Sequence, residues 1–458
     1  MKCCGAPRSS LQVPPADNYQ TEMNQPVTIK NETLPTNSPV FELWTHCPYL
    51  ACGEQTGAGP LAHICGKCGN AFNVCDHCRA TNRLMSIHCR GCGQKLGTQS
   101  WPMEAGLYWS SIPRASIKSI EAAQVPFPIN LGAGVQVSPV ASDGLIVICT
   151  THGGVVVLSE YTGARLLELS VGSQIASTPA LRNGMLFVAT AHDLHALDLA
   201  AYLDQPSLGR ITPAWRFSCG TEVISQPLLA DETSVYVLTQ NSLQTVLYSV
   251  SQEDGTEVWP SPLVLHPEQA GFPLLVKDHV VLVSPPSSVT VVAAATGDVT
   301  QTFSLNRRVD PQVAPFVTGN RVFLSDPMGH IFEIVFDRSG PLINPLHDAG
   351  SRISTIAASN EYLVLSHLAG VTLLSSRGSL LWTGETMESV STVPLIAGES
   401  MFVLDDGGNG LLFNMLKTNP VQRMRLLPGE IGMSPLRTQS HIVVVGAEGK
   451  VVALRWQS

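Results

Sequence analysis

From about residue 125 to its last residue, the chain consists of short apolar runs separated by turns that contain glycine. In the first such stretch, the pattern predicts four strands, over Val137–Ala141, Leu145–Thr150, Val155–Ser159 and Arg165–Leu169. Short turns with glycine join neighbouring strands, as in β-hairpins. Many of the strands are apolar and β-branched at successive positions, which indicates sheets packed on both faces.

The same four-strand unit recurs along the chain. Each unit starts with a small or polar residue that is usually followed by proline, at Pro139, Pro179, Pro227, Pro273, Pro315, Pro394 and Pro435. One unit has Thr355 in the corresponding region instead, and the starts then lie 39 to 48 residues apart. A period of about 40–50 residues is typical of β-propeller blades.

The repeats also predict how the ring closes. Eight starts give eight units, and the last unit ends in its third strand near Trp456. Residues 126–131, before the first unit, have the pattern of a fourth strand, so we expect them to complete the last blade. Closure pairs both ends of the ring and removes open sheet edges. The sequence therefore predicts an all-β, eight-bladed propeller of four-stranded blades over residues 125–458.

The repeats resemble the pyrroloquinoline-quinone (PQQ)-like propeller family. The resemblance rests on motifs such as GGVVVLSEYTGARLLEL, LYSVSQEDGTEVWP and GVTLLSSRGSLLWTG. It implies that a tryptophan of the fourth strand docks between adjacent blades. Trp215, Trp259 and Trp382 stand at that place, whereas other units have Leu167, Phe303, Ile343 and Met424 near it. The family includes quinoprotein dehydrogenases and non-enzymatic relatives, such as the propeller lipoprotein of outer-membrane barrel assembly.

Eight of the 12 cysteines lie between residues 47 and 92, in four closely spaced pairs. The first two pairs are separated by 12 residues (53–64), and the last two pairs are separated by 10 residues (79–88). Each of these gaps is long enough to form a hairpin. Two thiolates on a tight turn can bind one tetrahedral ion, and four sulfurs close a structural zinc site. We therefore predict two zinc sites, formed by Cys47, Cys52, Cys65 and Cys68, and by Cys75, Cys78, Cys89 and Cys92.

Two other readings of these cysteines remain. An iron–sulfur cluster also uses four cysteines, but the compact C-x2-C-x2-C run is missing. Disulfides would require an oxidising compartment. The knuckles CPYLACG, CGKCG, CDHCR and CRGCG resemble the double zinc-ribbon family over residues 45–97. This resemblance implies a small interaction module rather than an enzyme.

The remaining segments carry fewer signals. Residues 1–44 are rich in Pro, Asn, Thr and Ser, which predicts a disordered tail; modification of Cys3 and Cys4 is left open. Residues 98–124 are interpreted as a linker or docking segment that can contain a short helix over 114–123. The start of the chain has no apolar export signal, and no run of about 18 apolar residues could span a membrane. We therefore expect a cytoplasmic protein with reduced cysteines.

Charge and candidate catalytic residues limit the classes of function that the sequence favours. The formal net charge of −9 argues against nonspecific polyanion binding by the whole chain. Calcium-dependent quinoprotein dehydrogenases have an adjacent-cysteine disulfide, but the adjacent pair in this chain, Cys3-Cys4, lies far before the ring. The acidic run Asp405–Asn409 fits a hairpin turn as well as a calcium site. His192 and His195 are three residues apart, so they do not share a strand face.

These observations predict a non-enzymatic adaptor. It would bind protein partners through the zinc ribbons and the propeller, with no catalytic and no cofactor-binding residue assigned. The two structural zinc ions are the expected metals, and the partner is a protein of unknown identity. Two alternatives stay open: a quinone-dependent oxidoreductase of the PQQ propeller class, and nucleic-acid binding through the ribbons.

Overall fold

We analysed a computed structural model of the chain. It describes residues 47, 72–75, 78, 80–83, 89–93, 116–122, 128–142, 144–160, 163–182, 184–204, 212–220, 222–223, 227–267, 271–337, 340–368, 370–427, 433–438 and 441–457. Within these residues, no helix is both long and apolar enough to cross a membrane.

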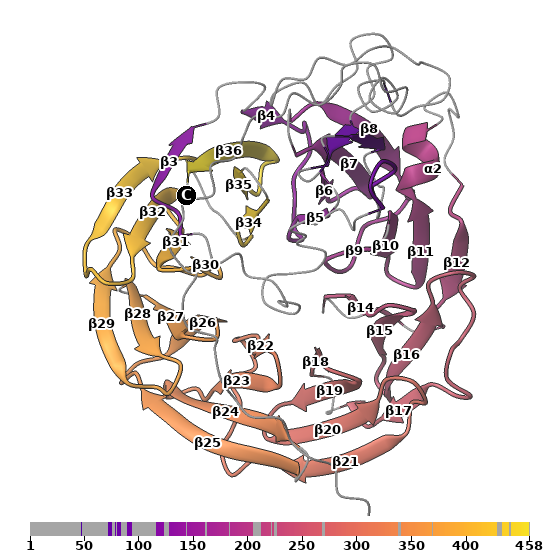
Figure 1. Ribbon diagram of the computed structural model, residues 1–458. Coiled ribbons are helices and arrows are strands. Elements are labelled where there is room, and N and C mark those ends of the chain that lie inside the picture. Colours follow the sequence, from indigo (N-terminus) through magenta and orange to yellow (C-terminus); the bar gives the residue numbers. More distant parts are fainter. Residues whose placement is uncertain are drawn as a thin grey trace, which may run out of the picture. The chain divides into compact units, whose positions relative to one another are not determined.

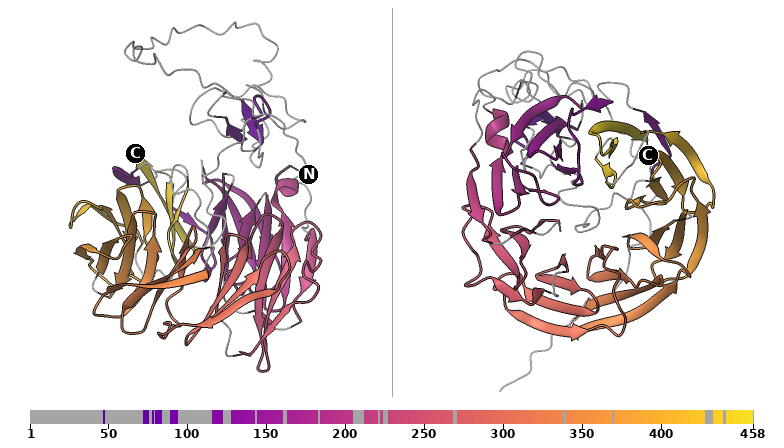
Figure 2. Two further views of the ribbon diagram at one scale, coloured as in Figure 1. Left: turned by 60° about the horizontal axis from the view of Figure 1, so that its bottom comes forward. Right: turned by 180° about the vertical axis from the view of Figure 1, so that it is seen from behind.

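Eight antiparallel sheets stand around a common axis and confirm the predicted eight-bladed propeller (Figure 1). In each blade the first strand lies innermost and the fourth lies at the rim, and Figure 2 shows the same ring from behind. Blades 1 and 2 consist of β5 (Val140–Ser142), β6 (Leu145–Cys149), β7 (Gly154–Ser159) and β8 (Arg165–Ser170), and of β9 (Ala180–Arg182), β10 (Met185–Ala189), β11 (Asp193–Asp198) and β12 (Trp215–Ser218). Helix α2 (Leu199–Asp204) connects β11 to β12.

Blades 3 to 5 continue the pattern. Blade 3 has an additional short strand, β13 (Glu222–Val223), which pairs with its second strand. The strands are β14 (Leu229–Ala230), β15 (Ser234–Gln240), β16 (Thr245–Ser251) and β17 (Leu263–Leu265); β18 (Phe272–Val276), β19 (His279–Ser284), β20 (Ser288–Ala293) and β21 (Val299–Ser304); and β22 (Phe316–Thr318), β23 (Arg321–Ser325), β24 (His330–Asp337) and β25 (Gly340–Asp348).

Blades 6 and 7 are regular, and blade 8 combines both ends of the propeller sequence. Blades 6 and 7 consist of β26 (Ile353–Ala358), β27 (Tyr362–His367), β28 (Gly370–Ser375) and β29 (Leu380–Glu385), and of β30 (Leu395–Ala397), β31 (Ser400–Leu404), β32 (Asn409–Asn414) and β33 (Pro420–Arg425). Blade 8 consists of β34 (Leu436–Arg437), β35 (His441–Val445), β36 (Lys450–Gln457), β3 (Ser119–Ala122) and β4 (Ile129–Asn130).

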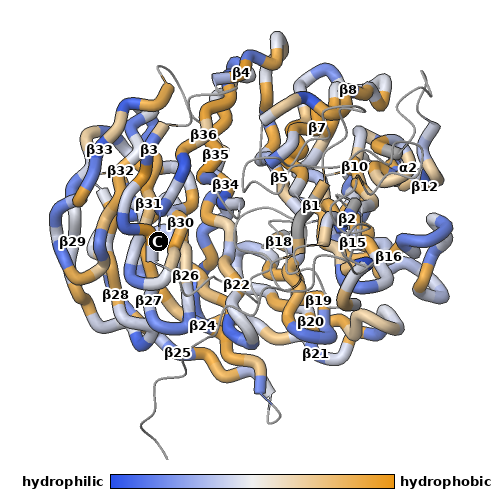
Figure 3. The backbone as a smooth tube through the Cα atoms, turned by 45° about the horizontal axis from the view of Figure 1, so that its top comes forward, coloured by the Kyte–Doolittle hydropathy of each residue, from blue (hydrophilic) through white to orange (hydrophobic). Residues whose placement is uncertain are grey.

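The middle strands of each blade are apolar on both faces because each blade packs between two neighbours. All five residues of β6 are buried. In β11, Leu197 packs with residues of blade 1, whereas Leu194 packs with residues of blade 3. The rim strands are more exposed, and β33 has half-buried and exposed positions in turn. Figure 3 shows this gradient, with β35 and β36 largely hydrophobic and β29 and β33 more hydrophilic.

The ring closes in blade 8, although not quite as the sequence predicts. Strand β4 pairs with only the first two residues of β36, at Lys450 and Val451. Strand β3 covers the other end of β36, with Ser119 opposite Gln457 and Ala122 opposite Leu454. Residues 126–131 therefore supply only part of the closing strand.

Part of residues 98–124, interpreted as a linker or docking segment, docks on the ring as strand β3, so the short helix expected over 114–123 is wrong. Ile117 and Ile120 are three residues apart, which is a helical spacing, and both are buried. Their burial comes from packing in the core shared by blades 7, 8 and 1. Tertiary pairing with β36 has overridden the local helical pattern, as is common for short strands.

A side chain of blade 7 holds the closing strand in place. Oε1 of Gln422 accepts a hydrogen bond from the backbone N–H of Ile120 at 3.0 Å, and Nε2 donates to the backbone carbonyl of Ile120 at 2.6 Å. The amide of Gln422 therefore pairs with β3 in both directions, much as a neighbouring strand would. This contact joins residues that are 302 positions apart in the sequence.

The expected tryptophan docking is confirmed, although Trp259 precedes the fourth strand of its blade, β17, whereas Trp215 and Trp382 lie within theirs. Nε1 of Trp215, Trp259 and Trp382 donates to a backbone carbonyl in the following blade, at Gln252 (2.9 Å), Ala294 (2.8 Å) and Met415 (2.7 Å). Each acceptor directly follows the third strand of its blade. The indole rings are almost fully buried, so each docked ring seals the interface and satisfies its own N–H.

In other blades the docking position is occupied by different residues. Trp215 and Trp382 each lie opposite the fourth residue of the third strand in their own blade. In the other blades with a regular fourth strand, the residues opposite that fourth residue are Leu167, Gln301, Asn344 and Gln422. Leu167 agrees with the residue expected from the sequence. The other three expected residues miss the position: Phe303 and Met424 lie two residues after it, and Ile343 lies one residue before it.

Two interfaces without tryptophan use a polar side chain for the same carbonyl position. In blade 5, Nη2 of Arg321 donates to the carbonyl of Ser376 in blade 6 at 2.5 Å. Glu333 binds Nε of Arg321 at 2.5 Å and keeps the guanidinium in place. In blade 8, His441 hydrogen-bonds the backbone of Glu160 in blade 1. Arg321 and His441 are both the first residue of the second strand in their blades.

We expect Gly297→Ala to destabilise the ring through its effect on Trp259. Gly297 has a φ of +79°, and an added Cβ would lie 2.6 Å from Cδ2 of the indole. Gly319→Ala is the matched control, because Gly319 has a φ of +62° and no atom within 4 Å of the added Cβ. Both variants carry the cost of left-handed backbone, but only Gly297→Ala must displace the ring, at an additional cost of about 1–3 kcal/mol. Denaturant unfolding measures the difference, and equal destabilisation of the two variants would show that the docked indole tolerates movement.

Candidate metal centre

A short hairpin brings four cysteines together before the propeller. Strands β1 (Phe72–Val74) and β2 (Thr81–Arg83) pair antiparallel, with Asn73 opposite Asn82. Cys75 directly follows β1, and its N–H donates to the carbonyl of Ala80 at 2.9 Å. Phe72 and Ala80 are buried, and Ala80 packs against the cysteines. The hairpin therefore fixes one pair of sulfurs, and the second pair follows at residues 89 and 92.

The sulfur atoms have the spacing that a tetrahedral ion requires. The Sγ atoms of Cys75, Cys78, Cys89 and Cys92 all lie within 4.8 Å of one another. Sγ of Cys75 is 3.8 Å from that of Cys92, and Sγ of Cys78 is 3.4 Å from that of Cys89. Zinc–sulfur bonds of about 2.3 Å in a tetrahedron place sulfurs about 3.8 Å apart. The predicted second set of cysteines thus forms one Cys4 cluster that could bind a metal ion.

Asn82 links the hairpin to the cysteine cluster through its side-chain amide. Its side chain is fully buried, with Nδ2 donating to the carbonyl of Ala80 at 2.8 Å and lying 3.7 Å from Sγ of Cys89. Oδ1 accepts a hydrogen bond from the backbone N–H of Arg90 at 2.7 Å. Nη2 of Arg90 donates in turn to Oγ1 of Thr81 at 2.6 Å. One amide therefore ties the hairpin to the turn that carries Cys89.

The turn from Cys89 to Gly93 directs backbone N–H groups toward sulfur. The N–H of Gly91 donates to Sγ of Cys89 at 3.3 Å, and the N–H of Gly93 donates to the carbonyl of Cys89 at 2.8 Å. Gly93 has a φ of +69°, which a glycine adopts without strain.

The surroundings shift the pKa values of Cys78 and Cys89 in opposite directions. Burial raises the pKa of Cys89, but the N–H groups of Cys92 and Gly91 and the neighbouring thiols more than offset it, and the pKa falls to about 6. Burial, followed by the neighbouring thiols, raises the pKa of Cys78 to about 12. Metals bind thiolates, so binding of an ion at this cluster would release protons.

The first predicted set is represented by a single described residue. Cys47 is buried, and its charge and that of Cys89 oppose the lowering of the pKa of Arg90 by burial. Cys52, Cys65 and Cys68 lie outside the described residues. The site formed by Cys47, Cys52, Cys65 and Cys68 therefore stays a prediction. Asn82 and Arg90 were not singled out from the sequence, where their only signal is that they lie between cysteine pairs.

The other candidate groups in the ring have structural roles. Cys149 lies in β6 and Cys219 follows β12; both are buried, and burial raises the pKa of each to about 12. They are not adjacent in sequence, so they do not form the neighbouring pair found in calcium-dependent quinoprotein dehydrogenases. Asp405 accepts hydrogen bonds from the backbone N–H and the side-chain amide of Asn409, at 2.9 and 3.0 Å. This carboxylate therefore closes a turn, as the hairpin interpretation predicts.

A comparison with protein families identifies the repeats. The family model described as outer membrane protein assembly factor BamB matches residues 90–202 and 212–344, more than half of the chain. The chain belongs to this family of PQQ-like propellers. No curated protein sequence matches the chain significantly.

Solved structures share the propeller fold at low sequence identity. BamB from Moraxella catarrhalis aligns with a TM-score of 0.56 and 16% identity, over 73% of this chain and all of the other. Sqt1 from Saccharomyces cerevisiae aligns with a TM-score of 0.58 and 12% identity, over 75% of this chain and all of the other. Quinohemoprotein alcohol dehydrogenase from Comamonas testosteroni aligns with a TM-score of 0.56 and 11% identity, over 78% of this chain and 80% of the other. These likenesses concern the fold alone.

We expect Asn82→Ala to weaken Zn²⁺ binding by the full chain about 10–100-fold, the usual effect of removing a group that orients a ligand. Arg90→Ala is the control, because it removes the contact with Thr81 but keeps the backbone N–H that Asn82 accepts. Competition with a chromophoric chelator measures both affinities. Unchanged affinity in Asn82→Ala would show that the four sulfurs are placed without its amide.

Proposed function

We propose that the chain is a non-enzymatic adaptor in the cytoplasm that binds protein partners through its propeller and its N-terminal cysteine module. In this proposal the module holds two structural zinc ions. One ion binds at Cys75, Cys78, Cys89 and Cys92, and the other binds at Cys47, Cys52, Cys65 and Cys68. The compact geometry of the Cys4 cluster supports the first site, and four sulfur ligands leave no open position for catalysis.

One end of the ring has the features of a contact surface. In a four-stranded antiparallel blade, the turn between the second and third strands lies at the same end as the link to the next blade. We call this end of the ring the linker end. Its turns include residues 241–244 in blade 3, 326–329 in blade 5 and 368 in blade 6, and the link from blade 6 to blade 7 runs through residues 386–391.

Large apolar side chains are exposed at the linker end. Leu243 is 81% exposed, Met328 70%, Leu368 79% and Met387 66%. They come from turns or links of blades 3, 5 and 6, so they are far apart in sequence but share one end of a rigid ring. Exposed apolar groups gathered on one face favour protein contact, and loops on rigid scaffolds commonly carry binding function. This is the observation that carries the proposal.

The comparisons support a scaffold without excluding an enzyme. The matching family is described as an assembly factor, but dehydrogenases share the same fold. The isolated positions of Cys149 and Cys219 favour the adaptor over the quinone-dependent alternative.

The double variant Met328→Asp/Leu368→Asp tests the surface. We expect it to lose at least one protein partner that the wild-type chain retains after cross-linking and affinity purification, since two charges would have to be desolvated in the contact. Leu416→Asp is the matched control, because Leu416 is 70% exposed in a turn at the opposite end of the ring. Quantitative mass spectrometry compares the three samples.

Two results would contradict the adaptor proposal. In the first, the double variant and the control retain the same partners as the wild type. In the second, the purified chain oxidises an alcohol or a sugar with an artificial electron acceptor after PQQ and calcium are added. The second result would favour the oxidoreductase alternative directly.

A further inference from the structure

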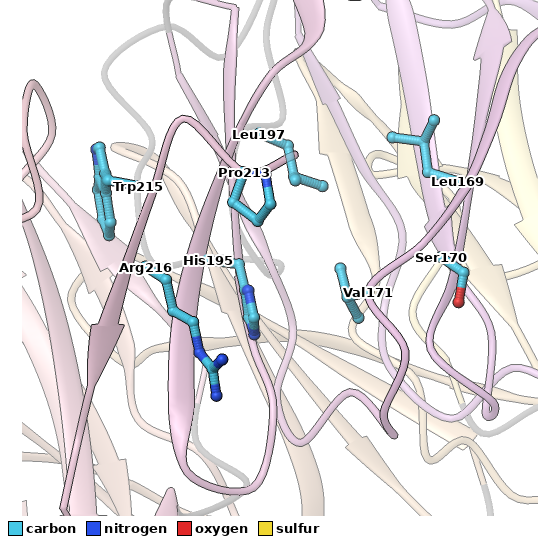
Figure 4. A pocket seen from close by; sticks show the side chains of 8 residues that line it. All are labelled: Leu169, Ser170, Val171, His195, Leu197, Pro213, Trp215 and Arg216. Atoms are coloured by element: carbon cyan, nitrogen blue, oxygen red, sulfur yellow. The ribbon is translucent and has the colours of Figure 1, made fainter. Parts of the chain in front are cut away.

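A cavity of about 300 Å³ lies at the interface between blades 1 and 2. Figure 4 shows the side chains around it, which come from β8 and the residue after it, from β11, and from β12 and the segment before it. The lining includes Leu169, Val171, His195, Leu197, Pro213 and Arg216. The volume equals about ten water molecules in the liquid and is at the lower end of the range for small-molecule sites.

The packing of this interface explains why space remains. Three other interfaces are sealed by a tryptophan ring that donates to a carbonyl of the next blade. In blade 1, the corresponding position is Leu167, which is only half-buried and has no donor to offer. In blade 2, the corresponding carbonyl belongs to Leu199, the first residue of helix α2. The cavity therefore lies in an interface that has no docked tryptophan.

His195 presents a buried polar group in this cavity. Its side chain is 7% exposed, and its Nδ1 is buried without a hydrogen-bond partner. A buried N–H donor without an acceptor is rarer than an unused acceptor, so Nδ1 is the unprotonated nitrogen and Nε2 carries the hydrogen. Burial, followed by the nearby charge of Arg216, lowers the pKa of His195, so the imidazole is neutral near pH 7. It can therefore donate one hydrogen bond through Nε2.

Arg216 adds a positive charge beside this donor. It pairs with His195 across β11 and β12, and Figure 4 shows the two side chains extending in the same direction. Nη2 of Arg216 binds Oδ2 of Asp193 at 2.5 Å, which orients the guanidinium through one of its three nitrogens. The other nitrogens have no partner among the described residues. The polar side of the cavity therefore offers donors, whereas Leu169, Val171, Leu197 and Pro213 offer apolar contact.

We propose that this cavity binds a small monocarboxylate with an apolar body. The carboxylate would accept hydrogen bonds from Arg216 and from Nε2 of His195, a charge-assisted arrangement that suits guanidinium geometry. The body would pack against the aliphatic side chains of both blades, Leu169 and Val171 from blade 1 and Leu197 from blade 2. This inference does not depend on the adaptor proposal, which uses the exposed turns of blades 3, 5 and 6.

Isothermal titration calorimetry of the full chain with 3-phenylpropionate tests the site. We expect saturable binding, and binding at least about tenfold weaker to 3-phenylpropanamide, which has the same shape but no charge. Arg216→Gln should weaken binding of the acid by a similar factor. Arg423→Gln is the matched control, because Arg423 is exposed and occupies the position of Arg216 in blade 7, one residue after Gln422.

A second variant keeps the test independent of charge. Val171→Phe places a ring in the cavity, and we expect it to abolish binding while thermal unfolding shows that the propeller is intact. The proposal is overturned if the acid does not bind at millimolar concentration, or if the amide binds as tightly as the acid. It is also overturned if Arg216→Gln and Val171→Phe both bind the acid like the wild type.

Discussion

Every blade of this protein is apolar on both faces, and this is the constraint on which the structure depends. A strand such as β6, with all five residues buried, cannot be stable unless a second sheet covers each side. A linear stack would leave two apolar faces in water, so the ring must close. Closure requires a fourth strand for the last blade, and the chain takes it from residues that precede the first blade. Blade 8 therefore links the two ends of the propeller sequence, with β3 and β4 against β36.

Different side chains form the hydrogen bond that links one blade to the next. The carbonyl that follows a third strand accepts a hydrogen bond from tryptophan in three interfaces and from Arg321 in another. Gln422 uses its amide on β3 itself, where closure needs it. An interface without tryptophan can therefore still satisfy this carbonyl, as Arg321 does. The interface between blades 1 and 2, which has Leu167 instead of an indole, contains a cavity lined by other residues of the two blades.

Much of the fold could be predicted from the sequence because a period of about 40 residues and glycine-containing turns are properties of the repeat itself. The blade count and the docking of Trp215 follow from that repetition. Strand β3 could not be predicted, because Ile117 and Ile120 have a helical spacing and owe their strand to partners more than 300 residues away. The Cys4 cluster followed from cysteine spacing, whereas the role of Asn82 depends on burial and on bonds to the turn that no local pattern announces.

The central claim is that both ends of the propeller sequence meet in blade 8 and remove the open edge of β36. Amide hydrogen exchange of the full chain, read by mass spectrometry, measures that edge directly. If β3 and β4 cover β36, peptides from residues 450–457 exchange as slowly as those from β28, the third strand of blade 6. Exchange of residues 450–457 as fast as that of the rim strand β33 would contradict the account, because β36 would then be an uncovered edge.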